Sequence, residues 1–75
     1  MKLPVVTPKQ VISAFKKCGF FIDHQTGSHI ILLNKNTNRR LVIAYHSRDI
    51  KRGTLKNILK SAGISNEEFI KLLKK

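Results

Sequence analysis

The sequence predicts an α+β fold in which one helix precedes three antiparallel strands and two helices follow them. Three observations predict it. Hydrophobic side chains recur at helical spacing in residues 8–18, short apolar runs alternate with polar turns in residues 20–45, and helical spacing returns after residue 54. Because the strands form one consecutive run, we expect a three-stranded antiparallel sheet with the helices packed on one face.

The first helix has clear start and stop signals. Thr7 is a suitable N-cap, Pro8 suits the first helical position, and Gln10 completes a capping box with Thr7. Gly19 follows the last apolar residue of the helical pattern, where glycine commonly ends a helix.

The three strands are expected at residues 20–24, 28–33 and 40–45. The polar turn at 25–27 separates the first two, and the Asn-rich segment 34–38 separates the second from the third. Such short connections predict hairpins.

Two helices are expected in the C-terminal third. Thr54 is a plausible N-cap for the first of them, and Gly63 marks its end. Ser65 and Glu68 have the spacing of a second capping box, which opens a short last helix.

Length and charge limit the function classes. Residues 1–75 are expected to form a single small domain. The 15 Lys and Arg side chains outnumber four acidic ones, give a formal net charge of +11, and run along the whole chain. A basic surface of this kind attracts nucleic acid, an anionic membrane or an acidic protein.

Cysteine content and hydropathy predict a cytoplasmic protein. The single cysteine, Cys18, cannot form an internal disulfide or a multi-thiolate zinc site. No apolar run reaches the roughly 18 residues of a membrane span, and the N-terminus lacks the hydrophobic region of a signal peptide. We therefore expect no membrane association.

The second and third strands are apolar at nearly every position instead of alternating. This pattern is typical of strands covered on both faces. A chain of 75 residues has too few helices to cover both faces, so we expect part of the sheet to be buried by a second copy or a partner protein.

Gly27, Ser28 and His29 form the strongest candidate site. Glycine permits a turn or a close ligand approach, and histidine exchanges protons near neutral pH. Cleavage of RNA needs a base for the ribose 2′-OH, cations for the phosphate and a proton donor for the leaving oxygen. His29 is the candidate base or acid, whereas the alternative is a structural or exposed strand-edge histidine. Ser28 contacts substrate or completes the turn.

The other two histidines carry weaker signals. His46 closes the third strand and could assist as acid or phosphate donor, although an exposed turn residue is the more common case. His24 ends the first expected strand, where a surface role is favoured. The three histidines lack the local spacing of zinc ligands, and the acids are scattered, so we expect chemistry without a metal or other cofactor.

A phosphate site is expected where the second helix begins. Backbone N–H groups at a helix N-terminus bind anions when cations lie beside them. The residues concerned are Lys51, Arg52, Gly53 and Thr54, with Arg48 just before them. A plain helix start with solvated charges is the alternative.

An ordered series of short motifs resembles the HicA-type mRNA interferase toxins of toxin–antitoxin systems. The motifs occur in family order between Thr7 and Leu73, and the ordered set is more specific than any single motif. They are Gly19-Phe20, Gly27-Ser28-His29, His46, Arg52-Gly53-Thr54-Leu55, Ala62-Gly63-Ile64-Ser65 and Glu68-Phe69.

The resemblance implies a fold like that of double-stranded-RNA-binding domains and an endoribonuclease that cleaves mRNA, with His29 catalytic. It also implies a HicB-type antitoxin that masks the active site. We expect the toxin to form either a homodimer or a toxin–antitoxin hetero-oligomer. The chain departs from the family pattern at Ala44, where proline is frequent, and at Thr26, where a basic residue is frequent. A non-catalytic RNA-binding module and a protein that only docks an acidic partner are the alternative functions.

Overall fold

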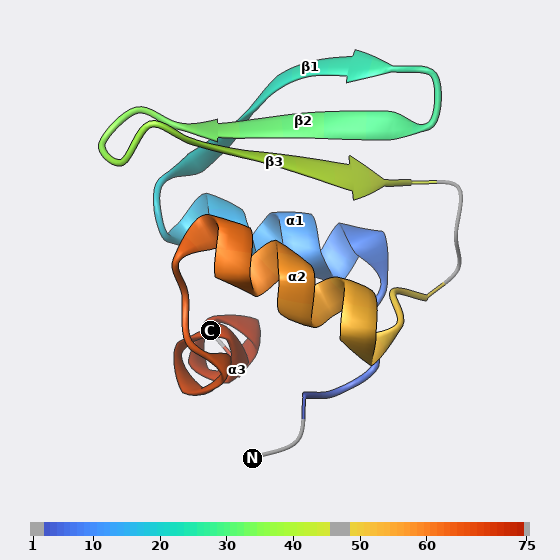
Figure 1. Cartoon of the computed structure of the whole chain (residues 1–75), viewed down its shortest axis with the longest axis vertical. Helices are drawn as coiled ribbons and strands as arrows, with labels where there is room; N and C mark the ends of the chain where they lie inside the picture. Colours follow the sequence, from blue (N-terminus) through green and yellow to red (C-terminus); the bar gives the residue numbers. More distant parts are fainter. Residues whose placement is uncertain (1–2, 46–48, 75) are drawn as a thin grey trace.

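The computed structural model describes residues 3–45 and 49–74, and its elements follow the expected order (Figure 1). A helix precedes three strands, and two helices follow. The elements are α1 (Pro8–Lys17), β1 (Phe20–Thr26), β2 (His29–Asn34), β3 (Arg39–Ala44), α2 (Arg52–Ala62) and α3 (Asn66–Lys74).

The strands form an antiparallel sheet in the order β1-β2-β3, and the helices lie on one side of it. In Figure 1, α1 and α2 lie directly under the sheet, and α3 lies farther from the sheet, beyond them. Contacts join α3 to both other helices. The predicted α+β fold, with its helices on one face, is confirmed, and this globule is consistent with the double-stranded-RNA-binding-domain-like fold.

The expected capping box of α1 is present. The Thr7 hydroxyl accepts a hydrogen bond from the Gln10 backbone N–H at 3.2 Å, and the Gln10 side chain accepts one from the Thr7 N–H at 2.9 Å. The helix ends at Lys17, and Gly19 follows with a φ of +102°, a conformation that glycine adopts without strain. Both ends of α1 are therefore set by the residues that the sequence indicates.

The first hairpin is tighter than expected. β1 continues to Thr26, and the connection to His29 consists only of Gly27 and Ser28. The expected turn at 25–27 begins two residues too early and is one residue too long, because Gly27 takes a φ of +53° and allows a two-residue hairpin loop. Thr26 and His29 consequently form the last cross-strand pair.

The second hairpin turns around a buried polar side chain. Asn34 is 6 % exposed, and its Oδ1 accepts hydrogen bonds from the backbone N–H groups of Asn36 (2.9 Å) and Thr37 (3.4 Å). Its Nδ2 donates to the carbonyl of Cys18 at 3.4 Å. Asn34 thereby holds the hairpin against the end of α1, and β3 runs over Arg39–Ala44, one residue earlier than expected.

The hydrophobic core lies between the sheet and the helices. Alternate strand residues point into it, together with one side of each helix. The strand residues in the core are Phe20, Ile30, Leu32, Leu41 and Ile43, and the largest buried helix residues are Phe15, Leu55, Leu59 and Phe69. Ile31 is also buried but points to the opposite face, between His24 and Val42 in the strand register.

The second helix begins earlier than expected. Its N-cap is Lys51, which makes no side-chain capping hydrogen bond, so the assignment of Thr54 as N-cap is wrong. A tertiary contact fixes this start instead, because Arg52 Nε donates to the Leu3 carbonyl at 2.8 Å. The neighbouring Ile50 N–H donates to the Val6 carbonyl at 2.7 Å. The N-terminal segment thus anchors the chain just before α2.

The last helix starts as the sequence indicates. The Ser65 hydroxyl accepts a hydrogen bond from the Glu68 backbone N–H at 3.2 Å, and Gly63 ends α2 with a φ of +72°.

Candidate active site

His29 lies at the end of the sheet where the first hairpin closes. It is the first residue of β2 and is exposed, paired with Thr26 on β1 and with Ala44 on β3. The Tyr45 N–H donates to the Ser28 carbonyl at 2.6 Å, which continues the pairing of the strands past His29. The two-residue turn formed by Gly27 and Ser28 therefore fixes the backbone from which the imidazole projects.

His29 lines a pocket of about 400 Å³ at the edge of β3. The pocket joins the middle strand to the segment before α2 and to the first turns of that helix. Its lining residues are His29, Val42, Ala44, Asp49, Ile50, Lys51, Thr54 and Ile58. An imidazole, a carboxylate, a lysine ammonium group and a hydroxyl thus share one concavity.

The structure brings only part of the expected phosphate site to His29. Lys51 and Thr54 share its pocket, whereas Arg52 and Gly53 line a different one beside Leu3. The Arg52 guanidinium is tied by the hydrogen bond from its Nε to the Leu3 carbonyl.

Two further residues of the expected site, His46 and Arg48, lie outside the described residues. Five lining residues were not expected from the sequence: Val42, Ala44, Asp49, Ile50 and Ile58. No local sequence signal marks them, because they reach the pocket through the packing of α2 against β3.

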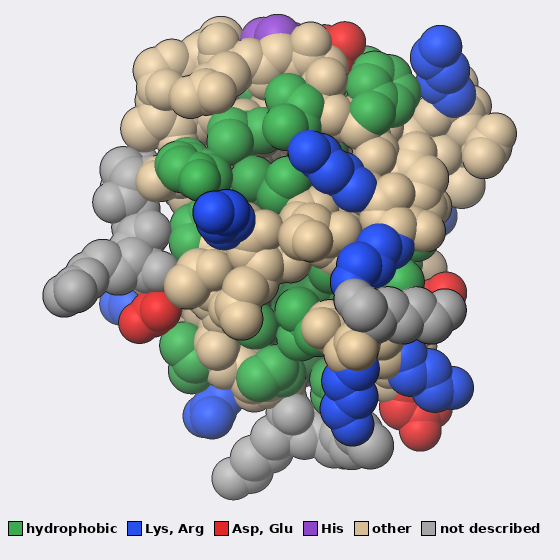
Figure 2. Space-filling view, turned by 180° about the vertical axis from the view of Figure 1, so that it is seen from behind, with side chains coloured by type: hydrophobic (Ala, Val, Ile, Leu, Met, Phe, Trp, Pro, Cys, Tyr) green, Lys and Arg blue, Asp and Glu red, His purple; other side chains and the backbone are tan. Residues whose placement is uncertain are grey.

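Basic side chains are distributed over the surface. Figure 2 shows Lys and Arg spread over one face with fewer Asp and Glu among them, and hydrophobic side chains visible between the charges. With the net charge of +11, this distribution produces a field that attracts polyanions from many directions.

Among residues 3–45 and 49–74, no group of three or more His, Cys, Asp or Glu side chains is placed to hold a metal ion.

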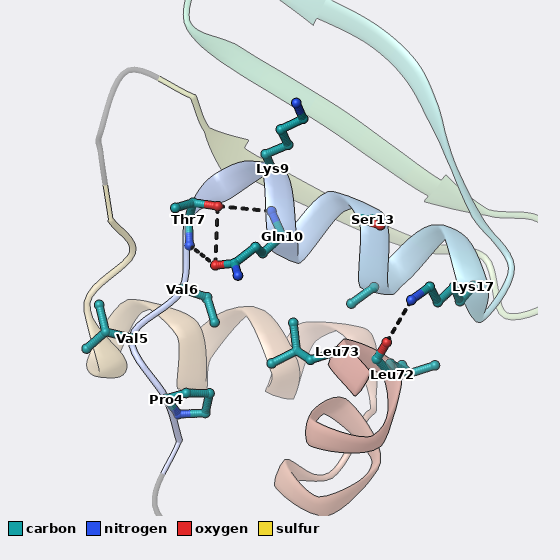
Figure 3. A pocket seen from close by; sticks show the side chains of 11 residues that line it. Pro4, Val5, Val6, Thr7, Lys9, Gln10, Ser13, Lys17, Leu72 and Leu73 are labelled. Atoms are coloured by element: carbon teal, nitrogen blue, oxygen red, sulfur yellow. Dashed lines mark hydrogen bonds between the residues drawn. The ribbon is translucent and has the colours of Figure 1, made fainter. Parts of the chain in front are cut away.

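A slightly larger pocket, of about 440 Å³, lies away from His29 (Figure 3). It is formed by the segment Pro4–Thr7, by α1 and by Leu72 and Leu73 of α3. Lys17 Nζ donates to the Leu72 carbonyl at 3.0 Å beside it. The charged side chains in its lining are lysines, and it holds no histidine or carboxylate for proton transfer near neutral pH. We therefore place the candidate site at His29.

A second histidine lies on the same face of the sheet as His29. His24 is in the interior of β1, paired with Ile31, instead of at a strand end as expected. Its Nδ1 lies 2.7 Å from Asp23 Oδ2, and both side chains are partly exposed. The expected surface position of His24 is correct, but its pairing with Asp23 was not foreseen.

Comparison with protein families identifies the family of this chain. The model of a family described as "HicA toxin of bacterial toxin-antitoxin" matches residues 8–64, more than half of the chain. The chain belongs to the HicA toxin family of bacterial toxin–antitoxin systems. The matched region of this HicA toxin begins with α1 and ends two residues after α2, so it contains the sheet, His29 and the whole pocket.

Membership of this family implies an antitoxin partner for the HicA toxin. A search of curated proteins gives no match. Within the described part of the chain, no helix has the length and apolar character needed to cross a membrane.

Proposed function

We propose that this HicA toxin is an endoribonuclease that cleaves mRNA, with His29 as the acid–base group. The observation that carries the proposal is the position of His29, exposed in a pocket that also contains Lys51 and Thr54. The family resemblance, which extends to Gly27-Ser28-His29, supports the same activity.

The proposed chemistry uses the residues of this pocket. The ribose 2′-OH loses its proton, the 2′-oxygen attacks the adjacent phosphorus, and the bond to the 5′-oxygen breaks. The products are a 2′,3′-cyclic phosphate and a 5′-hydroxyl. His29 transfers a proton in this reaction, and Lys51 binds the negatively charged phosphate. Thr54 offers a hydroxyl to the same phosphate. The reaction as proposed needs no metal ion.

The arrangement of the strands supports this assignment. The two-residue turn before His29 leaves its backbone little freedom, so the imidazole is presented from a defined position. Proton transfer is efficient only from a well-positioned group, because misplacement by about 1 Å can cost about a hundredfold in rate.

The test compares His29→Ala with the unmodified protein on RNA in the presence of EDTA. We expect the variant to keep its RNA affinity and melting temperature and to lose cleavage. Lys71→Gln, on the exposed side of α3, is the control for loss of a surface functional group and should cleave normally. Persistent cleavage by His29→Ala overturns the role of His29.

Absence of cleavage by well-folded unmodified protein that binds RNA would instead favour a non-catalytic RNA-binding module. Expression in cells provides a second measurement. The unmodified toxin should arrest growth, and the His29→Ala form should not.

We further propose that the antitoxin is of the HicB type and covers the His29 pocket. The sheet face opposite the core is apolar here. Val42, which lines the pocket, is half-exposed, and its cross-strand partner Ile31 is buried. An acidic partner is attracted by the charge of +11. Light scattering on the isolated toxin at high concentration tests whether this apolar face of the sheet must be covered by a partner. A soluble monomer that does not aggregate would count against it.

A further inference from the structure

We propose that His24, oriented by Asp23, donates the proton to the leaving 5′-oxygen while His29 takes the proton from the 2′-OH. The inference rests on the proposed RNA cleavage and assigns its second proton-transfer group. Three features of β1 carry it: the register that places His24 near His29, the bulge at Asp23, and the contact between Asp23 and His24.

The strand register sets the distance between the two histidines. Thr26 pairs with His29, and His24 pairs with Ile31, so His24 is the diagonal neighbour of His29 across β1 and β2. Paired residues point to the same face, and diagonal neighbours in an antiparallel pair are about 7–8 Å apart. Both imidazoles therefore project from the face opposite the core.

A backbone separation of about 7–8 Å leaves room for one phosphodiester between the two side chains. A hydrogen bond to a phosphate or ribose oxygen spans about 2.7–3.2 Å. Two such bonds, one from each ring, bracket a phosphorus with its attacking and leaving oxygens. The attacking and leaving oxygens lie on opposite sides of the phosphorus in an in-line displacement, so the base and the acid must also lie on opposite sides.

A bulge in β1 explains how Asp23 reaches His24. The pairing passes from Ile22–Leu32 directly to His24–Ile31, which leaves Asp23 as the extra residue. Neighbouring residues of a regular strand point to opposite faces, so Asp23 could not normally meet His24. The bulge breaks this alternation, and bulges are common beside active sites because they redirect a side chain.

The contact with Asp23 selects the nitrogen that reacts. Asp23 Oδ2 and His24 Nδ1 are 2.7 Å apart, and a carboxylate can only accept, so Nδ1 is the donor. Nε2 is then the nitrogen that exchanges a proton with substrate. The adjacent carboxylate also balances the positive charge that a proton-donating imidazolium carries. The His24 side chain is 48 % exposed, which leaves it accessible to RNA.

The proton balance closes over the cleavage step. His29 gains the proton of the 2′-OH, the 2′-oxygen forms its bond to phosphorus, and the bond between phosphorus and the 5′-oxygen breaks. The proton of His24 Nε2 goes to the 5′-oxygen, which leaves as a hydroxyl. Exchange with water then restores both histidines, so no other reactant is required.

The test compares two RNA substrates that differ in the leaving atom, which is the 5′-oxygen in one and sulfur in the other. One substrate is an RNA whose cleavage site has been mapped, and the second carries a 5′-bridging sulfur at that site. A thiolate leaves without protonation, so this substrate needs no proton donor. We expect His24→Gln to cleave the oxygen substrate about 10²- to 10⁴-fold more slowly than unmodified protein and the sulfur substrate at a similar rate. His29→Ala should be slow on both.

Two more variants separate proton donation from charge and position. His24→Arg keeps a cation but cannot donate a proton at neutral pH, so it should show the same dependence on the leaving group as His24→Gln. Asp23→Asn should show a smaller loss of the same kind. Lys71→Gln is again the control, and affinity for an RNA with a 2′-deoxy group at the site should be unchanged in all variants.

The outcomes distinguish the two proposals. Normal cleavage of the oxygen substrate by His24→Gln, or equal slowing on both substrates, overturns the role of His24 and leaves His29-dependent cleavage intact. Restoration of cleavage by His24→Arg shows that charge alone suffices and also overturns it. If the unmodified protein cleaves neither RNA, the proposed ribonuclease function fails, and this inference fails with it.

Discussion

Ala44 and His29 are direct partners across β2 and β3, and both line the same pocket. Side chains of cross-strand partners have their Cβ atoms about 4.5–5.5 Å apart. The methyl group of Ala44 therefore lies beside the imidazole, and only glycine would place a smaller side chain there. Access to His29 from the pocket depends on this small side chain.

Enlarging Ala44 should block the site. We expect Ala44→Phe to reduce RNA cleavage by about tenfold or more, because the ring would displace the phosphate from His29. Cleavage of the mapped RNA is the measurement, together with the melting temperature. Val5→Phe, which enlarges an exposed side chain at the other pocket, should leave cleavage unchanged. Normal cleavage by folded Ala44→Phe would show that RNA does not approach His29 past residue 44.

Gly63 and Gly53 should respond oppositely to alanine. Gly63 has a φ of +72°, and an added Cβ would lie 2.9 Å from the Arg39 guanidinium carbon. We expect Gly63→Ala to lower the free energy of unfolding by about 1–2 kcal/mol. Gly53 is the second residue of α2 and has open space around it, so Gly53→Ala should raise the free energy of unfolding, by up to about 0.5 kcal/mol. Urea denaturation measures both, and equal effects would contradict the assigned conformation at Gly63.

Asn34 should contribute to stability through its side-chain amide. Asn34→Ala leaves the Cys18 carbonyl and the N–H groups of Asn36 and Thr37 without this partner. We expect the free energy of unfolding to fall by about 1–3 kcal/mol. Asn36→Ala is the matched control, because Asn36 takes part through its backbone and its side chain is exposed. A similar loss of unfolding free energy in both variants would show that any substitution in this loop destabilises the protein, and not the loss of the Asn34 amide in particular.

Cys18 should react slowly with alkylating agents. Burial raises the pKa of its thiol above the ordinary value of 9.0, and the Glu68 carboxylate raises that pKa further. A raised pKa means less thiolate at any pH below it, and the thiolate is the reactive form. The rate of reaction with iodoacetamide should therefore rise only at higher pH than for an unfolded cysteine peptide.

Glu68→Gln tests the second cause of this shift. Removing the carboxylate should move the pH dependence of Cys18 alkylation part of the way back toward that of the peptide. If Cys18 in the unmodified protein shows the same pH profile as the peptide, the raised pKa is contradicted.

Local sequence signals were sufficient to predict those elements whose determining interaction joins residues close together in the sequence. The caps formed by Thr7 and by Ser65 each involve a residue three positions away, so the spacing alone predicted them. The strand order and the single helix-covered face followed from consecutive apolar runs with short connections. The HicA family model also matches one continuous segment, residues 8–64.

Interactions between distant segments required the tertiary structure. The start of α2 is fixed by Leu3, which lies 49 residues from Arg52, so no local pattern could replace Thr54 as the expected cap. The pocket is a similar case, because Lys51 and Thr54 reach His29 only when α2 packs on β3.

The sequence determined the class of fold and the choice of His29, since glycine and histidine at a strand start are visible in one segment. The tertiary structure decided which side chains surround that histidine. A one-residue difference in the hairpin turn changes which face each β1 side chain occupies. The two-residue turn of Gly27 and Ser28 and the bulge at Asp23 bring His24 to the face of His29. These are properties of strand register, and pairing across the sheet fixes them.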